Sequence, residues 1–182
     1  MATGDTENRR LGMEWLEAVI KAFYPAEPIG ADTNRVEAEG WFSPDDDCVG
    51  RIIDLFAQAR QTVDVCVFTI TDNRIAEAIL RAHERGVRVR VVSDDDKAFD
   101  KGSDIVHLRS RGVECREDNT QHHMHHKFAI FDHQLLLTGS YNWTRSASLN
   151  NEENFIISGD PRLLKAFARM FGKLWEDFGR TS

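Results

Sequence analysis

The sequence has few of the features that mark secreted, fibrous or membrane-spanning proteins. Three cysteines among 182 residues are too few for a disulfide framework and indicate a reducing compartment. No apolar run approaches the roughly 20 residues that cross a bilayer, and the first ten residues lack the apolar core of a secretory signal. With 41% hydrophobic and 29% charged residues, the composition is globular. We therefore expect a soluble, cytoplasmic protein without a transmembrane anchor.

The sequence also lacks a net basic charge. The chain carries −7 overall, and residues 1–47, with eleven acidic and four basic side chains, account for all of it. The remaining residues are neutral before their histidines are counted. Bulk charge therefore neither predicts nor excludes a local nucleic-acid groove.

Residues 1–40 are predicted to form an acidic N-terminal helix and a linker. Apolar residues recur at helical spacing from Leu11 to Phe23, and two prolines and a glycine follow before residue 31. The helix either packs on the rest of the chain or docks on a membrane surface or partner. Its shortage of lysine and arginine favours packing.

Residues 41–182 read as one α/β domain. Helices are expected at 49–60, 73–85, 103–111 and 162–178, and strands at 63–70, 87–93, 113–116, 125–131, 135–139 and 154–158. Strands that alternate with helices predict layers around a central sheet.

A cluster of polar residues lies at two neighbouring strands of this domain. His125 and Lys127 are two residues apart on one strand, so their side chains share a face. Ser140 and Asn142 are also two apart, just after Gly139, which permits a close backbone approach. An imidazole, an ammonium, a hydroxyl and an amide are groups that hold a phosphate, with the histidine as nucleophile or proton donor.

The density of histidines here raises the alternative of a metal site. Five of the seven histidines lie within twelve residues. No nearby cysteine or paired carboxylate completes a zinc pattern, and Lys127 would place a cation beside the metal. We therefore expect neither a metal nor another cofactor.

The spacing of these residues resembles the HKD signature of the phospholipase D superfamily. The matching positions are His125, Lys127, Asp132, Gly139, Ser140 and Asn142, followed by the acidic position Glu153. Residues 41–178 are similar to its small single-motif branch, which contains bacterial nucleases and the Zucchini-type enzymes, described both as cardiolipin hydrolases and as endonucleases. The closer likeness is carried by VDVCVFTIT, RGVRVRVVSD, MHHKFAIFD, LTGSYNWT and NNEEN.

The resemblance implies a mixed central sheet flanked by helices, and a metal-independent phosphodiesterase. His125 would attack phosphorus and form a phosphohistidine intermediate. Because the chain has one HKD motif, a second histidine would come from a partner, which implies a homodimer with the active site at its two-fold interface. Lys127 and Asn142 would bind the phosphate oxygens with support from Ser140, and Glu153 would orient His125.

Four further residues near the motif are assigned roles from their positions in the sequence. Asp132 lies at a strand end entering a turn, so a structural role is favoured over a catalytic one. His126 faces away from His125 and is expected to be packed and hydrogen-bonded. His123 and Trp143 are candidate substrate contacts, Trp143 by stacking on a base.

The sequence leaves three interpretations of the function, which differ in the substrate or in whether there is one. Single-stranded nucleic acid is preferred, and the basic residues available to bind it are Arg74, Arg81, Arg85, Arg88, Arg90, Lys97, Lys101, Arg109, Arg111 and Arg145. The acidic triplet Asp94–Asp96 counts against tight polyanion binding. Hydrolysis of a phospholipid such as cardiolipin is the alternative, disfavoured by the acidic N-terminal segment. A non-catalytic scaffold is the third interpretation, disfavoured because every motif residue is present.

Overall fold

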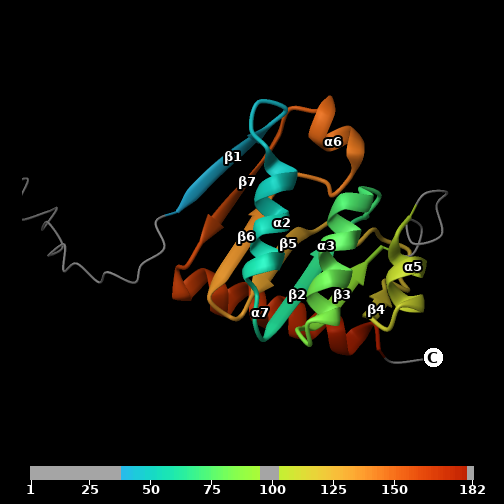
Figure 1. The fold of residues 1–182 in the computed structure, drawn as a ribbon. Coiled ribbons are helices and arrows are strands. Elements are labelled where there is room, and N and C mark those ends of the chain that lie inside the picture. Colours follow the sequence, from blue (N-terminus) through green and yellow to red (C-terminus); the bar gives the residue numbers. More distant parts are fainter. Residues whose placement is uncertain (1–37, 95–102, 180–182) are drawn as a thin grey trace, which may run out of the picture. The chain divides into compact units, whose positions relative to one another are not determined.

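The computed structural model describes residues 38–94 and 103–179, which belong to one compact unit (Figure 1). Its strands form a single sheet in the order β1-β7-β6-β5-β2-β3-β4. Their bounds are β1 Glu39–Ser43, β2 Thr62–Val67, β3 Arg88–Ser93, β4 Glu114–Glu117, β5 Lys127–Phe131, β6 Leu135–Gly139 and β7 Glu153–Ser158. β3 runs parallel to β2 and β4, while the other pairs are antiparallel. The expected mixed sheet is confirmed. The predicted helix at 11–23 lies outside the described residues.

Three of the described helices begin where an aspartate side chain caps them. Their bounds are α2 Cys48–Gln58, α3 Asn73–Glu84, α5 Ile105–Ser110, α6 Arg145–Leu149 and α7 Pro161–Asp177. Asp47, Asp72 and Asp160 each accept a backbone N–H from the first turn of α2, α3 and α7 respectively. None of the helices in the described ranges is long and apolar enough to span a membrane.

The two faces of the sheet bury separate apolar clusters. Val65, Val91 and Ala129 pack in the cluster that contains the buried residues of α2 and α3. On the opposite face, Phe128 and its neighbours pack against Phe171 of α7. Figure 1 shows α2 and α3 on one side of the sheet and α7 on the other. Alternate residues of β5 thus face opposite layers, as its sequence predicts.

Two short elements were not expected from the sequence. β1 includes Glu39 and Gly40, which were assigned to the linker, and β7 is its single pairing partner among the described strands. Its pairing partner is more than a hundred residues away, so no local pattern reveals it. α6 has five residues and one buried side chain, too few for a helical pattern. The sheet thus begins two residues before the expected domain boundary.

Strand directions bring the motif to one edge of the sheet. β5 begins where its antiparallel neighbour β6 ends, and β6 ends where β7 begins. The end of β2 pairs with the start of β5, and β3 ends beside β2. Residues next to all five of these strand ends therefore lie along the same edge.

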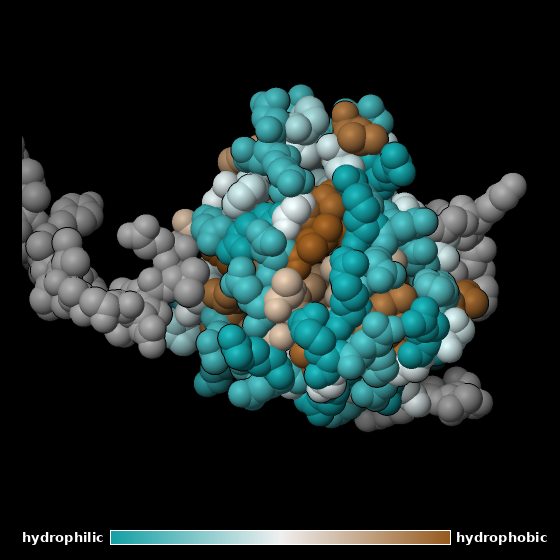
Figure 2. Space-filling model, viewed as in Figure 1, coloured by the Kyte–Doolittle hydropathy of each residue, from teal (hydrophilic) through white to brown (hydrophobic). Residues whose placement is uncertain are grey.

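The face seen in Figure 2 is mostly hydrophilic. Hydrophobic residues form a narrow strip there between polar neighbours, rather than a broad patch. Charged residues on the outer faces of α2 and α3 account for this appearance, because the apolar residues of both helices are buried.

Candidate active site

His125 and Lys127 are in direct contact, as the strand spacing predicts. The Lys127 ammonium lies 3.0 Å from Nδ1 and 3.2 Å from Nε2 of His125, and donates a hydrogen bond of 3.0 Å to the His125 carbonyl oxygen. Lys127 is only 8% exposed, whereas His125 is exposed at the mouth of the site. β5 begins at Lys127, so His125 precedes the strand rather than opening it.

Burial keeps both groups less basic than usual, and the charge of Lys127 adds to the effect on His125. Burial, followed by the charge of Lys127, lowers the pKa of His125 below its ordinary value of 6.5. Burial also lowers the pKa of Lys127, which the carboxylate of Glu153 partly offsets. A neutral imidazole has a free electron pair on one ring nitrogen, which is the form that attacks phosphorus.

Phe68 supports both groups, and sequence reasoning missed it. It follows β2, and its ring centroid lies 4.6 Å from that of His125 and 5.3 Å from the Lys127 ammonium. The ring of His123 packs on the same phenyl group at 5.7 Å. An aromatic residue after a buried strand has many structural uses, so no signal in the sequence singled it out.

Glu153 holds Asn142 rather than His125. Its Oε2 accepts the backbone N–H of Asn142 at 2.6 Å, and its Oε1 accepts the side-chain amide of Asn151 at 2.8 Å. Among the described residues, no hydrogen bond joins Glu153 to His125, so the expected orienting contact is not found. The Oδ1 atom of Asn142 is buried and has no hydrogen-bond partner within the described ranges.

Gly139 and Ser140 connect β6 to β7 at the same edge. A Cβ on Gly139 would lie 2.1 Å from the carbonyl oxygen of Asn154, so the close approach expected of this glycine is confirmed. The Ser140 hydroxyl oxygen accepts the backbone N–H of Asn154 at 3.0 Å. Gly139 also lines a cleft of about 420 Å³ together with His125 and Lys127.

Asp132 has the structural role that its position predicts. Its carboxylate accepts three backbone N–H groups, from Arg60, Gln61 and Thr62, at 2.8 to 2.9 Å. Burial raises the pKa of Asp132, but these three hydrogen bonds outweigh that effect and hold the pKa below its usual range. Asp132 lies at the end of β5 opposite to His125, which separates it from the other motif residues.

The assignment of Trp143 as a base-stacking residue is wrong. Its side chain is 0% exposed and packs edge-on against Phe56 in the apolar core, because the chain turns inward after Asn142 to pair with Ile70. His126 was expected to be packed, but it is exposed and its ring contacts Phe128.

Several of the basic residues considered for nucleic-acid binding are already paired. Arg90 forms a two-bond ion pair with Asp64 and stacks on aromatic rings of α7. Arg74, Arg109 and Arg111 are paired with Asp72, Glu117 and Glu84 respectively. Lys97 and Lys101 lie outside the described residues. Arg90 is thus largely taken up by contacts within the fold, whereas the side chains of Arg74, Arg109 and Arg111 stay 51%, 43% and 50% exposed although they are paired.

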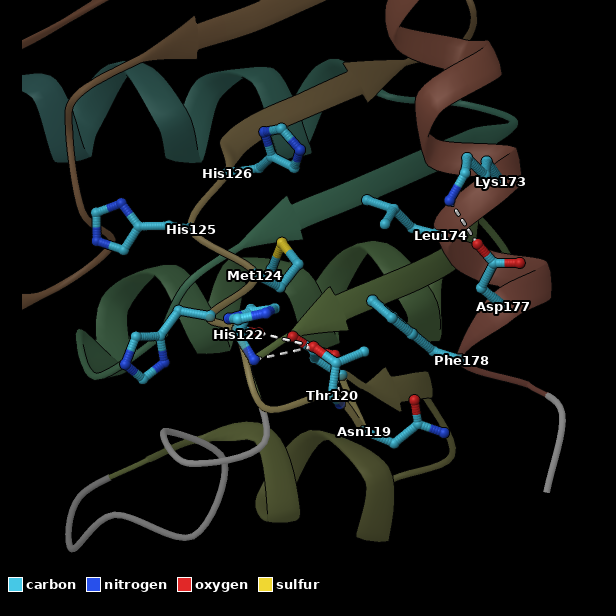
Figure 3. A pocket seen from close by; sticks show the side chains of 12 residues that line it. Asn119, Thr120, His122, Met124, His125, His126, Lys173, Leu174, Asp177 and Phe178 are labelled. Atoms are coloured by element: carbon cyan, nitrogen blue, oxygen red, sulfur yellow. Dashed lines mark hydrogen bonds and ion pairs between the residues drawn. The ribbon is translucent and has the colours of Figure 1, made fainter. Parts of the chain in front are cut away.

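A larger cleft of about 710 Å³ opens beside His125. In Figure 3, side chains of the loop before β5, including His122 and His126, lie opposite Leu174 and Phe178 from the end of α7. His123 also lines it, and its Nδ1 lies 3.2 Å from the buried carboxylate of Asp94. Of the acidic triplet counted against polyanion binding, Asp94 is fully buried, and Asp95 and Asp96 lie outside the described residues.

Metal ligation has no support from the arrangement of these side chains. Within residues 38–94 and 103–179, no three histidine, cysteine or acidic side chains are placed to hold one metal ion. The donors of the histidine cluster point to different partners, namely Asp94, Lys127 and Phe128.

Comparison with known proteins agrees with this geometry. The family model described as "Cardiolipin synthase, PLD-like domain" matches residues 52–175. A mitochondrial cardiolipin hydrolase of Chlamydomonas reinhardtii is 43% identical over 161 residues, which cover 86% of this chain and 72% of that protein. The Homo sapiens protein of the same name is 41% identical over 133 residues, covering 73% of this chain and 53% of that protein.

Two solved structures share the fold. Nuc of Salmonella typhimurium, a phospholipase D family member, matches with a TM-score of 0.71 and 23% identity, covering 77% of this chain and 94% of that chain. NucT of Helicobacter pylori matches with a TM-score of 0.70 and 24% identity, covering 77% of this chain and 96% of that chain. The family model covers more than half of the chain. The two curated relatives are about two fifths identical to the chain over the aligned residues. The chain therefore belongs to the phospholipase D superfamily and is a phosphodiester hydrolase.

Proposed function

We propose that the protein is a metal-independent endonuclease that cleaves single-stranded nucleic acid through a phosphohistidine intermediate. The observation that carries the proposal is the contact between Lys127 and His125 at the mouth of the large cleft. A substrate phosphate would take over the ammonium as its hydrogen-bond partner and thereby leave the neutral imidazole facing phosphorus.

The proposed reaction has two displacements. A ring nitrogen of His125 attacks phosphorus, an N–P bond forms, and the P–O bond to the leaving group breaks. The leaving oxygen takes a proton from His125 of the partner subunit, which then accepts a proton from water as the water oxygen attacks phosphorus and the N–P bond breaks. The second histidine requires a homodimer, because the chain has a single HKD motif.

Lys127 and Asn142 would stabilise the pentacoordinate phosphorus. Lys127 supplies a positive charge that is nearly buried, where electrostatic stabilisation is strongest. Glu153 would act as a positioning residue, because it holds the backbone of Asn142. Ser140 would support the same segment through its bond to Asn154.

The large cleft favours a nucleotide as the group next to the scissile phosphate. One wall carries several imidazoles, and the other carries Leu174 and Phe178 (Figure 3). Polar donors for phosphate and sugar, opposite an aromatic ring for a base, are the usual means of binding single strands.

Hydrolysis of cardiolipin is the second candidate, and two observations favour it. The curated relatives carry the name mitochondrial cardiolipin hydrolase. The smaller cleft beside His125 and Lys127 is lined by Phe128, Phe167 and Met170, which suit an acyl chain. The cytoplasmic location stays a prediction from the sequence, and the name of the relatives favours mitochondria instead.

A side-by-side assay in EDTA tests the proposal. Purified wild type and His125→Asn are offered labelled single-stranded RNA, single-stranded DNA, duplex DNA and cardiolipin vesicles. We expect wild type to cleave a single strand and His125→Asn to lose at least about 1,000-fold in rate, because the nucleophile is removed. His133→Gln is the matched control, since His133 lies in the turn at the far end of β5.

The alternatives give different results. Cleavage of cardiolipin without cleavage of any nucleic acid would show that the phospholipase assignment is right and the nuclease assignment is wrong. Equal cleavage by wild type and His125→Asn would refute the assigned nucleophile, and inactivity on every substrate would favour the scaffold. Matching thermal unfolding of the variants shows that any lost activity is chemical.

A further inference from the structure

The smaller cleft beside His125 and Lys127 contains a cation that the proposed chemistry does not use. This cleft, of about 420 Å³, is lined by His125 and Lys127 and also by residues of α7, among them Arg169. Sequence reasoning did not single out Arg169. A group bound at Arg169 would share the cleft with a phosphate bound at Lys127.

Arg169 is an exposed cation with no partner in the part of the chain that the structure describes. No hydrogen bond or ion pair holds its guanidinium there. None of the residues three or four positions away on α7 is acidic; they are Lys165, Ala166, Gly172 and Lys173. Because these positions are the neighbours on a helix surface, α7 itself offers no carboxylate to neutralise Arg169.

The charged groups of the smaller cleft are all of one sign. None of its lining residues is acidic, whereas Lys127 and Arg169 are cationic, and His125 and His126 add two imidazoles. A guanidinium is permanently charged, and its fork of N–H donors matches the oxygens of a phosphate. The cleft therefore suits a ligand with more than one negative charge.

The smaller cleft and the large cleft follow one another along α7. His125 and His126 line both of them. α7 contributes Arg169 and Met170 to the smaller cleft, and four residues further along it contributes residues to the large one, including Leu174 (Figure 3). A strand extends from both sides of its scissile phosphate, so a strand bound at His125 can occupy both clefts.

We infer that Arg169 binds the phosphate next to the scissile one, on the side of the smaller cleft, in a single-stranded nucleic acid. This inference rests on the proposed nuclease function and adds a specificity-determining residue to it, because a substrate with a single phosphate leaves Arg169 without a ligand. Cardiolipin also carries two phosphates. Nucleic acid is favoured because a strand fills the clefts on both sides of His125.

The test compares binding of two matched ligands without turnover. Full-length chains that carry His125→Asn are titrated into fluorescein-labelled thymidine pentanucleotides, and fluorescence anisotropy gives Kd. One ligand has charged phosphates throughout, and in the other every phosphate except a central one is an uncharged methylphosphonate. Adding Arg169→Gln should weaken binding of the charged ligand about tenfold and of the methylphosphonate ligand less than about twofold, as expected for one lost charge-assisted contact.

The salt dependence of Kd gives a readout that a merely structural effect would not move. Each phosphate contact on a single strand contributes about 0.7 to the slope of log Kd against log salt concentration, so Arg169→Gln should lower this slope by about 0.7. Arg169→Lys keeps the charge and should retain most of the slope.

Lys165→Gln is the matched control. It removes one positive charge one turn earlier on α7, from a residue that lines neither of the two clefts, and should bind like the parent. Equal weakening of both ligands by Arg169→Gln, no weakening, or the same loss from Lys165→Gln would overturn the inference.

Parallel measurements distinguish failure of the inference from failure of the proposed function. If the parent binds the charged pentanucleotide and Arg169→Gln lacks the expected difference between ligands, only the inference fails. If the parent binds no single strand, whether or not it binds cardiolipin vesicles, the nuclease proposal fails and the subsite fails with it. Hydrolysis of bis(p-nitrophenyl) phosphate by chains that retain His125 reports the phosphodiesterase chemistry independently of either result.

Discussion

Protonation of two neighbouring side chains controls the chemistry at the residue scale. His125 must be neutral to attack phosphorus, and Lys127 must be charged to bind it. Both have a lowered pKa, mainly because of burial. A lowered pKa increases the neutral fraction of His125 at neutral pH. The pKa of Lys127 is lowered from an ordinary value of 10.5, which lies well above neutral pH. The same environment therefore favours the neutral form of His125 that attacks phosphorus, whereas the proton donor, His125 of the partner subunit, must be protonated.

This arrangement predicts the acidic side of the pH–rate profile. The rate should fall as the pH drops through the pKa of His125, because the protonated ring has no electron pair to donate. Since that pKa lies below 6.5, the acidic midpoint of kcat/KM should also lie below 6.5. Initial rates across a pH series in EDTA measure it. A midpoint above 6.5 would contradict the assigned environment of the nucleophile.

Glu153 provides a second prediction at this scale. Glu153→Gln keeps an oxygen near the Asn142 N–H but removes the charge, so Asn142 should be held less firmly. We expect kcat to fall by about 10- to 100-fold, less than for His125→Asn, with KM little changed. Steady-state kinetics check this split. A loss as large as that of His125→Asn would instead assign Glu153 a direct part in the reaction.

The turn between β5 and β6 illustrates the scale of single elements. Asp132 and His133 both have positive φ angles, of 51° and 57°, in a region where aspartate and histidine are enriched among non-glycine residues. Asp132 also anchors the segment that enters β2 through three backbone N–H groups. These contacts give Asp132 a structural part in joining the turn to the start of β2.

Asp132→Asn should therefore destabilise the fold. Asparagine tolerates the same backbone conformation but has one acceptor oxygen for three N–H groups, so we expect a loss of about 1–2 kcal/mol at neutral pH. A carboxylate whose pKa is lowered in the folded state stabilises the fold at pH values above its unfolded-state pKa. This stabilisation is lost as the pH falls through the folded-state pKa. The difference from wild type should therefore shrink below about pH 4. Urea unfolding of wild type and Asp132→Asn at neutral pH and below about pH 4 measures this difference in stability. An equal difference at the two pH values would contradict the role of the charge.

Prediction from sequence succeeded for the elements with strong periodicity. The alternating faces of β5 and the ends of α2, α3 and α7 were expected within a few residues, because burial repeats every second or every third to fourth residue. β1 and α6 were missed because they are short and depend on distant partners.

At the scale of the whole molecule, the proposed chemistry needs two copies of His125. A single chain supplies one, so activity should depend on subunit composition. When wild-type chains are mixed and equilibrated with equal amounts of tagged His125→Asn chains, about a quarter of the dimers retain two intact histidines. Activity should therefore follow the square of the wild-type fraction. Capture through the tag confirms exchange, and a linear dependence would show that one His125 suffices.

The sequence by itself determined the layered α/β organisation, the shared face of His125 and Lys127, and the structural position of Asp132, because these depend on local periodicity and turn chemistry. Only the tertiary structure decided that Trp143 lies in the core, that Glu153 holds Asn142, and that Asp94 lies behind His123. Each of those contacts joins segments that are remote in sequence or depends on which way the chain turns after a strand. Such contacts are decided by the packing of the whole sheet, and no local pattern records them.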